Sequence, residues 1–224
     1  MLTALRRDRR ILIKLVLALL VIYAGIAAFV FLLPTETFDV WFSRGVQRYQ
    51  SPWLDQFMLF ISWFATTWGG GITVAVAALA WLLAGRRLEA GFMLLPLLVV
   101  PIVSVIKQTF GRMRPTADMV RVIRQFNHES FPSGHVVFYT VFFGFLAYVL
   151  YRSRELNGLV RRVGIGLCVG LIALVPFSRM YLGAHWFTDV LAGFILGLIL
   201  LIGLAEWYSG IKRRARRRAA AVAG

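Results

Sequence analysis

Apolar runs of about twenty residues recur along this chain, and each is long enough for a helix to cross the hydrocarbon core of a bilayer. Hydrophobic residues make up 59% of the 224 residues, and the mean hydropathy is +0.74. This apolar fraction lies well above the share found in soluble domains. The runs therefore predict an all-α integral membrane protein, built as a helical bundle within the bilayer.

The positions of the apolar runs predict six transmembrane helices. Five of them are expected at about residues 11–33, 88–106, 133–151, 163–181 and 185–206. The remaining stretch, 53–84, contains Gly69-Gly70-Gly71, so we expect a short helix to about Trp68 and then a spanning helix through Ala84. One long tilted helix is the alternative, because membrane helices tolerate glycine.

The segment between residues 34 and 52 predicts an additional helix outside the six spans. Aromatic and apolar residues recur there at helical spacing, with charged residues between them: Phe38, Trp41, Phe42, Val46 and Tyr49, and Asp39, Arg44 and Arg48. This pattern favours an amphipathic helix in the membrane interface, and a connecting loop is the alternative.

No sequence repeat or low-complexity linker divides the chain, so we interpret residues 1–224 as one membrane-embedded domain. It has a basic segment at about 1–10 and a basic tail at about 208–224. A cleaved signal peptide is the alternative for the first run. That run is too long for a typical signal core and ends without a small-residue cleavage site, so we expect a retained helix. Cys168 is the only cysteine, which excludes an internal disulfide.

The formal net charge of +15 is distributed in a way that argues against a nucleic-acid partner. Most basic residues flank apolar spans, where topology and contact with anionic lipids account for them. With six spans, 17 Lys and Arg residues fall on the side of the two termini and 8 on the opposite side. The positive-inside rule then predicts cytoplasmic termini in a multi-pass protein of the cell membrane.

Three polar blocks interrupt the apolar chain, and the expected topology puts all of them on the extracytoplasmic face. They are Lys107-x6-Arg114-Pro115, Pro132-Ser133-Gly134-His135 and Ser178-Arg179-x5-His185-x3-Asp189. Charged side chains beside membrane helices are costly unless they pair or have a function. Phosphoryl transfer is one such function, because catalysis there is mostly positioning and stabilisation of negative charge.

The residue types in the blocks suit that chemistry. Lys107, Arg114 and Arg179 can supply three cations to a phosphate group. The helix expected to begin after Pro132 presents free N–H groups, Gly134 permits close approach, and the Ser133 hydroxyl adds a donor. The sequence therefore predicts a phosphate-binding site.

A histidine and a carboxylate give the site its expected nucleophile. His185 and Asp189 are four residues apart at the expected start of the last helix, so they should share one helical face. Asp189 can accept the Nδ1–H of His185, which leaves Nε2 to act as a nucleophile. His135 would protonate the leaving alkoxide and later deprotonate the attacking water. No HExxH motif or carboxylate cluster is present, so we expect no metal and no cofactor.

In this order and spacing, the blocks resemble the signature of the type 2 phosphatidic acid phosphatase superfamily, which reads KxxxxxxRP, PSGH and SRxxxxxHxxxD. Every signature position between Lys107 and Asp189 matches. The resemblance implies a metal-independent membrane lipid phosphatase with a phosphohistidine on His185 and with His135 as the acid. It implies phosphate binding by Lys107, Arg114, Ser133, Gly134 and Arg179. The implied substrates are undecaprenyl pyrophosphate, phosphatidylglycerophosphate and phosphatidic acid.

Other functions stay open at the level of sequence. A phosphotransferase would pass the phosphoryl group to a lipid or sugar hydroxyl. Vanadium haloperoxidases resemble this site, but they are soluble, and six spans argue against them. A non-catalytic transporter or scaffold would not need the full set of polar residues.

The sequence does not decide among the lipid substrates, and it does not indicate an oligomeric state. Five residues of the outer loop match no signature position: Arg112, Arg121, Arg124, His128 and Glu129. Contact with a lipid headgroup would explain them, and so would a solvated, ion-paired loop.

Overall fold

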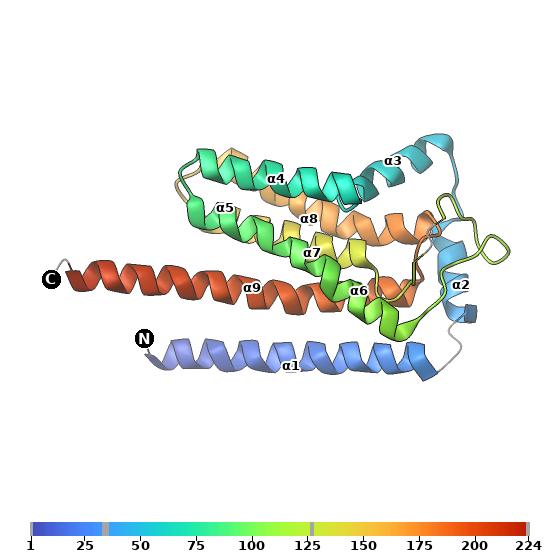
Figure 1. The fold of residues 1–224 in the computed structure, drawn as a ribbon, viewed down its shortest axis with the longest axis horizontal. Coiled ribbons are helices and arrows are strands. Elements are labelled where there is room, and N and C mark those ends of the chain that lie inside the picture. The colour runs from blue at the N-terminus through green and yellow to red at the C-terminus, as the bar shows by residue number, and fades with distance from the viewer. Residues whose placement is uncertain (1, 33–35, 126–127, 223–224) are drawn as a thin grey trace.

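The computed structural model describes residues 2–32, 36–125 and 128–222, and within those ranges its regular structure is entirely helical (Figure 1). The helices are α1 (Leu2–Leu32), α2 (Glu36–Val46), α3 (Pro52–Trp63), α4 (Thr67–Leu83), α5 (Arg87–Leu94), the 3₁₀ segment η1 (Leu95–Leu98), α6 (Val99–Phe110), α7 (Gly134–Arg152), α8 (Gly158–Tyr181) and α9 (Phe187–Val222). The predicted all-α fold is confirmed. The expected end of the first span, Leu33, lies outside the described residues.

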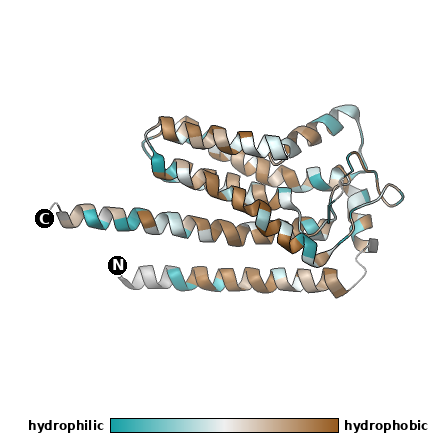
Figure 2. Cartoon of the chain, in the orientation of Figure 1, coloured by the Kyte–Doolittle hydropathy of each residue, from teal (hydrophilic) through white to brown (hydrophobic). Residues whose placement is uncertain are grey.

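Among the described residues, five helices or helix combinations are long and apolar enough to cross a membrane. The bent pair α3 and α4 makes a sixth span if the two are counted together, with an angle of 56° between them. The ribbon coloured by hydropathy is mostly hydrophobic along the middle of the helices, and its hydrophilic residues gather toward the ends of the bundle (Figure 2). The multi-pass architecture predicted from the apolar runs is therefore confirmed.

The break within the second span was predicted at the wrong place. Helix α3 ends at Trp63 rather than near Trp68, and the glycines lie inside the first turns of α4. Thr66 begins α4, because its hydroxyl accepts a hydrogen bond from the Gly69 N–H at 3.1 Å. A Cβ on Gly69 would lie 2.0 Å from the Trp63 carbonyl oxygen. That glycine therefore allows the close approach at the bend, and Thr66 sets the start of α4.

Two other spans differ in detail from the predicted helices. The span 87–110 consists of α5, η1 and α6, with Pro96 in the 3₁₀ turn and Pro101 in the first turn of α6. Proline has no N–H to donate, so each one stands where a new helical segment begins. The last helix was expected to end near Glu206, but α9 continues to Val222. Its final part is rich in Ala and Arg, which favour helix.

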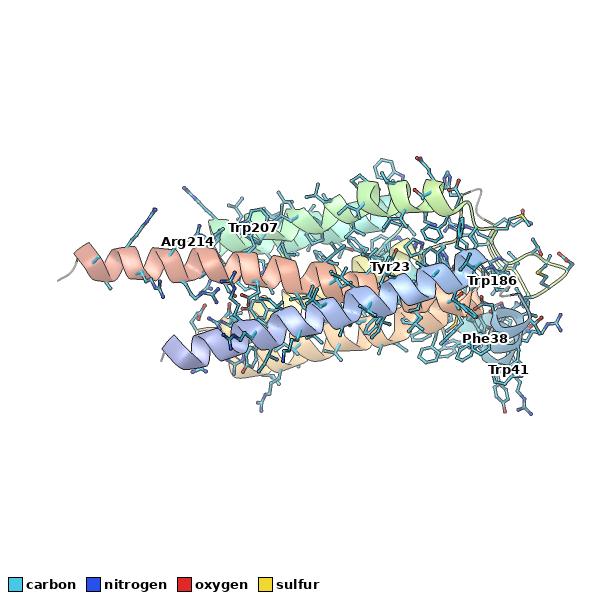
Figure 3. The ribbon with its side chains drawn as sticks, turned by 90° about the horizontal axis from the view of Figure 1, so that it is seen from below. Tyr23, Phe38, Trp41, Trp186, Trp207 and Arg214 are labelled. Carbon is cyan, nitrogen blue, oxygen red and sulfur yellow. The ribbon has the colours of Figure 1, made fainter. Side chains whose placement is uncertain are left out.

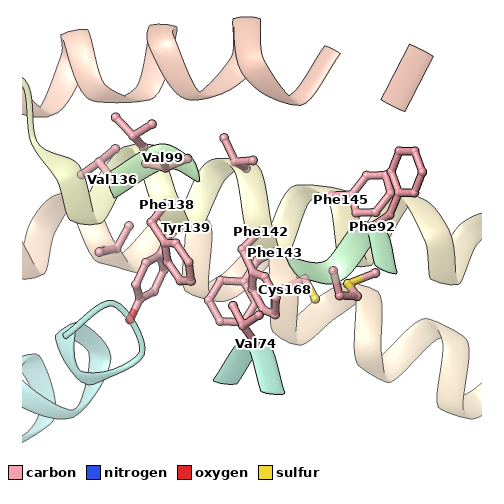
Figure 4. Packing of buried hydrophobic residues seen from close by; sticks show 14 of the residues in the cluster. Val74, Phe92, Val99, Val136, Phe138, Tyr139, Phe142, Phe143, Phe145 and Cys168 are labelled. Atoms are coloured by element: carbon pink, nitrogen blue, oxygen red, sulfur yellow. The ribbon is translucent and has the colours of Figure 1, made fainter. Parts of the chain in front are cut away.

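Helix α7 is the centre of the bundle. Most of its aromatic side chains are buried and pack against α4, α5, α6 and α8, namely Phe138, Tyr139, Phe142, Phe143 and Phe145. Figure 4 shows Phe138, Phe142 and Phe145 of this helix together with Val74 of α4 and Phe92 of α5. A helix that is apolar on all sides is stable only when surrounded. The start of α7, where the PSGH block lies, is therefore held by the core.

Glycines bring α7 and α9 close together. A Cβ on Gly193 would lie 2.8 Å from the Ser133 carbonyl oxygen, and one on Gly197 would lie 2.6 Å from the Thr140 Cβ. Gly164 of α8 similarly approaches Leu150 of α7. Gly166, in contrast, has no heavy atom within 4 Å of such a Cβ, nor has Gly170. Small residues thus serve close packing mainly where α9 crosses α7.

The two ends of the bundle differ in character. The start of α1 and the end of α9 lie at one end of the bundle. The polar loop 111–133 and α2 lie at the other end (Figure 1). Figure 3 shows Trp186, Phe38 and Trp41 at the loop end and Arg214 toward the opposite end. All three polar blocks therefore lie opposite the termini, as the span count predicted. The assignment of the termini to the cytoplasm stays a prediction.

Helix α2 forms where an amphipathic helix was predicted, and it runs crosswise over the loop end of the bundle (Figure 1). Its inward side combines polar residues with Phe42 and Val46, which pack against the core. Asp39, Ser43 and Gln47 repeat every four residues and are buried, whereas Phe38 and Trp41 are exposed. The helix therefore exposes the rings of Phe38 and Trp41 and turns a row of polar groups toward the loops beneath it.

Gly193→Ala should weaken the contact between α7 and α9, because the new methyl group would meet the Ser133 backbone. Overpacking of this kind costs roughly 1–3 kcal/mol, so thermal unfolding in detergent should shift to lower temperature. Gly203→Ala on the same helix is the matched control, because its Cβ would have nothing within 4 Å. Equal melting temperatures for the two variants would contradict this account of the packing.

Candidate active site

The three polar blocks converge at the loop end of the bundle. Lys107 lies in the last turn of α6 and Arg179 in the last turn of α8. Ser133, Gly134 and His135 stand at the start of α7, while Asp189 is in the first turn of α9. Arg114 comes from the loop after α6, and His185 from the turn before α9. Four helix ends and two connections thus supply the predicted residues.

The link between His185 and Asp189 differs from the one predicted. Helix α9 begins at Phe187, so His185 precedes the helix instead of lying on its face. His185 Nδ1 is 3.6 Å from Asp189 Oδ2, too far for a direct hydrogen bond. Ser130 lies between them, since its Oγ donates to Asp189 Oδ2 at 2.5 Å and is 3.4 Å from His185 Nδ1. The carboxylate therefore faces the imidazole through a serine hydroxyl.

The other ring nitrogen of His185 faces a cation. Arg114 Nη1 lies 3.2 Å from His185 Nε2. A guanidinium only donates hydrogen bonds, so Nε2 must be the acceptor and Nδ1 must carry the proton. This is the tautomer that a nucleophilic Nε2 requires.

The surroundings of His185 keep the ring neutral. The side chain is only 2% exposed, and burial lowers its pKa well below 6.5, with the charges of Arg114, Arg179 and Lys107 acting in the same direction. Burial also lowers the pKa of Arg114, to about 10, which leaves the guanidinium charged at neutral pH. A neutral imidazole thus stands beside fixed positive charge.

Two of the predicted phosphate-binding cations meet at one backbone oxygen. Lys107 Nζ and Arg114 Nη2 both donate to the Glu129 carbonyl oxygen, the latter at 3.3 Å. Arg114 also donates through Nη1 to the Ala184 carbonyl oxygen at 2.5 Å. Two donors converging on a single oxygen is the arrangement that an anion needs.

Arg179 is positioned by a serine of the neighbouring helix α3. Its side chain is buried, and Nη1 donates to Ser62 Oγ of α3 at 2.9 Å. Ser62 Oγ lies 2.7 Å from Ser178 Oγ, which donates to the Met58 carbonyl oxygen. Helix α3 therefore fixes the guanidinium that the third block supplies.

Ser133 supports the start of α7 through its backbone. Its N–H donates to the Asp189 carbonyl oxygen at 3.0 Å, which joins α7 to the first turn of α9. Its hydroxyl is buried and makes no hydrogen bond within the described residues. A buried hydroxyl without a partner is unusual and indicates a donor that a ligand can use.

A cavity of about 450 Å³ lined by residues of the loop after α6 adjoins the site. Its wall includes Arg112 and Arg114 together with Arg124, Gln125 and Glu129. In the part of the chain that the structure describes, no group of three or more His, Cys, Asp or Glu side chains is arranged to hold a metal ion.

A family model described as the PAP2 superfamily matches residues 89–213, more than half of the chain. This region includes every site residue just described except those of α3. The chain belongs to the PAP2 superfamily. The resemblance found in the three polar blocks is thereby confirmed.

Curated relatives include phosphatidylglycerophosphatase B of Bacillus subtilis (strain 168), which is 35% identical over 111 residues, 49% of this chain and 53% of that protein. Lipid phosphate phosphatase delta of Arabidopsis thaliana is 28% identical over 106 residues, 44% of this chain and 26% of that protein. The matches thus span about half and about a quarter of these relatives' lengths.

Two solved structures share the fold. One is the transmembrane PAP2 type phosphatidylglycerolphosphate phosphatase from Bacillus subtilis, with a TM-score of 0.78 and 23% identity over 88% of this chain and 98% of that one. The other is Aquifex aeolicus LpxE, with a TM-score of 0.54 and 21% identity over 74% and 93% of the two chains. At these identities the likeness concerns the fold.

Sequence reasoning missed several residues that support the PAP2 signature positions. Ser130 stands between His185 and Asp189, and Ser62 contacts Arg179. Gln47 of α2 accepts from the Arg121 N–H at 3.0 Å and donates to the Arg121 carbonyl oxygen at 2.7 Å. The four-residue spacing of polar side chains on α2 was a visible signal for Gln47. Nothing in the sequence marked Ser130 or Ser62.

One loop residue left open by sequence has a structural partner. Arg121 forms a two-pronged ion pair with Asp55 of α3, at 2.8 and 2.6 Å, and Tyr181 donates to the same carboxylate at 2.6 Å. The outer loop of this PAP2 protein is therefore ion-paired to α3 at this point. This agrees with the ion-paired loop that the sequence left open as an alternative to contact with a lipid headgroup.

His185 should stay neutral in NMR titrations until the pH falls well below 6.5, because burial and three cations disfavour the imidazolium. The unfolded chain would protonate this histidine near its ordinary pKa, so stability should decrease as the pH falls through about 6.5. Histidine labelling of the detergent-solubilised protein, with His185→Asn for assignment, would test this. A protonated His185 signal at pH 7 would contradict the described surroundings.

Proposed function

We propose that this protein is a metal-independent phosphatase that hydrolyses the phosphate or pyrophosphate headgroup of a membrane lipid. The observation that carries the proposal is the neutral His185, with Nε2 3.2 Å from Arg114 beside converging cations. Membership of the PAP2 superfamily and similarity to proteins named as lipid phosphate phosphatases support it.

The chemistry begins with attack by His185 Nε2 on the terminal phosphorus. As the N–P bond forms, the bond from phosphorus to the leaving oxygen breaks, and His135 protonates that oxygen. Lys107, Arg114 and Arg179 stabilise the charge on the three equatorial oxygens. Water then attacks the phosphohistidine, with its proton passing to His135, and inorganic phosphate leaves. The other product is a lipid alcohol or a lipid monophosphate.

The position of the site at one end of the bundle suits a lipid substrate. Phe38 and Trp41 of α2 are exposed beside it, and aromatic rings favour the membrane interface. A headgroup could then reach Arg114 while its chains stay in the bilayer. The charge bias of the spans supports an extracytoplasmic location for this end. We take phosphatidylglycerophosphate, undecaprenyl pyrophosphate and phosphatidic acid as the candidate substrates, the first because of the curated relative's name.

Purified protein should release phosphate from at least one of these three lipids, and His185→Ala should lower the rate by more than about 10³-fold. Phosphate release across the panel, with circular dichroism to verify folding, would measure this. Thin-layer analysis of the lipid products would reveal transfer to a second lipid, which would favour a phosphotransferase instead. Wild-type protein inactive on every lipid would contradict the proposal.

His135→Ala should separate the two chemical steps when the substrate is a diphosphate lipid. A lipid phosphate leaves readily without protonation, whereas water still needs a base, so phosphoenzyme should accumulate. We expect a labelled phosphohistidine that is stable to alkali and labile to acid, and that is absent from the His135→Ala/His185→Ala double variant. A label retained in the double variant would place the nucleophile elsewhere.

Activity should persist in EDTA, because the proposed charge stabilisation comes from lysine and arginine. Phosphate release before and after chelation, followed by addition of Mg²⁺, would test this. Complete loss restored by Mg²⁺ would contradict the metal-independent mechanism.

A further inference from the structure

A single arginine outside the signature joins two buried carboxylates. Arg112 Nη2 lies 2.6 Å from Asp39 Oδ2 of α2, and Nη1 contacts Asp189 Oδ1 of α9. Nη1 also donates to Thr188 Oγ1 at 2.7 Å. Both carboxylates are 0% exposed. The guanidinium therefore connects α2, the loop after α6 and the first turn of α9.

Asp39 also completes the N-terminus of α9. The residue before this helix is Trp186, whose side chain cannot accept hydrogen bonds from the first turn. Asp39, which lies on α2, supplies the missing acceptor. Its Oδ1 accepts from the Thr188 N–H at 3.0 Å, and its Oδ2 accepts from the Thr188 hydroxyl at 2.8 Å. Asp189 accepts from the Trp186 N–H at 2.9 Å, the reciprocal half of a capping box.

These contacts fix both oxygens of Asp189. Arg112 holds Oδ1, whereas Oδ2 is turned to the Trp186 N–H, to Ser130 and to His185. The carboxylate cannot rotate without breaking a buried charge-assisted hydrogen bond. The orientation of the group that faces the imidazole thus depends on α2.

We propose that Asp39 and Arg112 are positioning residues for the phosphatase reaction, acting on His185 through Asp189. The inference rests on the proposed function. Asp39 fixes Arg112 and the first turn of α9, and Arg112 fixes the Asp189 carboxylate and offsets part of its charge. Neither residue needs to contact the lipid phosphate.

The two residues carry opposite charge, so their removal should act oppositely on His185. Asp39→Asn leaves Arg112 without its balancing anion, which disfavours the imidazolium and moves the acid limb of kcat/KM to lower pH. Arg112→Gln removes a cation and moves this limb to higher pH. The other charged or titratable groups that face His185 are Lys107 of α6, Arg114 of the loop, His135 of α7, Arg179 of α8 and Asp189 of α9. Glu129 of the loop acts on Lys107 and Arg114.

The experiment measures kcat, KM and the pH dependence of kcat/KM in detergent micelles with the best lipid of the panel. For Asp39→Asn and Arg112→Gln we expect kcat to fall roughly 100-fold, the loss typical of a slightly misplaced catalytic group, with KM changed less than about threefold. The double variant should lose no more than the worse single variant, because both break one connection. Asp118→Asn and Arg48→Gln, exposed at the same end, are the matched controls and should retain wild-type kinetics.

Arg112→Lys keeps the charge but not the fork that reaches two carboxylates. It should lower kcat without moving the acid limb, and it serves in place of Asp39→Asn if that variant does not fold. Wild-type kcat in Asp39→Asn and Arg112→Lys, or acid limbs that shift in the same direction for the two neutral variants, would overturn the inference. Lower melting temperature with unchanged kcat would reduce both residues to a structural role. Inactive wild-type protein would instead contradict the proposed function.

Discussion

Buried charge at one end of an apolar bundle is the constraint on which this structure depends. Lys107, Arg114 and Arg179 stand where the helices end, and burial of such groups is costly unless each finds hydrogen-bond acceptors. The loop 111–133 and the turn before α9 provide backbone carbonyl oxygens, and α3 provides the Ser62 hydroxyl. Helix α2 then closes over the loop with a polar face of its own. The arrangement of the whole loop end follows from satisfying these charges.

The sequence was sufficient for the spans and for the convergence of the signature residues, because both depend on strong local signals. Apolar runs of membrane length identify helices, and three spaced blocks identify their ends. The bend between α3 and α4 was misplaced because glycines seemed to be helix breakers, whereas the Thr66 cap determines where α4 starts. The direction of the polar face of α2 depends on tertiary contacts with residues far away in the chain.

The contact between His185 and Asp189 likewise combines a part that the sequence predicted with a part that only the fold determines. Four-residue spacing correctly brought His185 near Asp189, but it assumed a helix through both residues. Gly183 has a left-handed backbone with φ of 66°, and the turn it forms delays α9 until Phe187. The imidazole consequently lies one serine hydroxyl away from the carboxylate. Such a contact depends on Ser130 from another segment, and periodicity carries no information about it.

The cap that α2 gives to α9 bears on what counts as a minimal catalytic fragment. The region matched by the family model begins at residue 89 and contains every signature residue. Yet the first turn of α9 takes its cap from Asp39, and Arg179 takes an acceptor from Ser62, both upstream of that region. A fragment restricted to 89–213 would keep the complete signature and lose the groups that hold it in place.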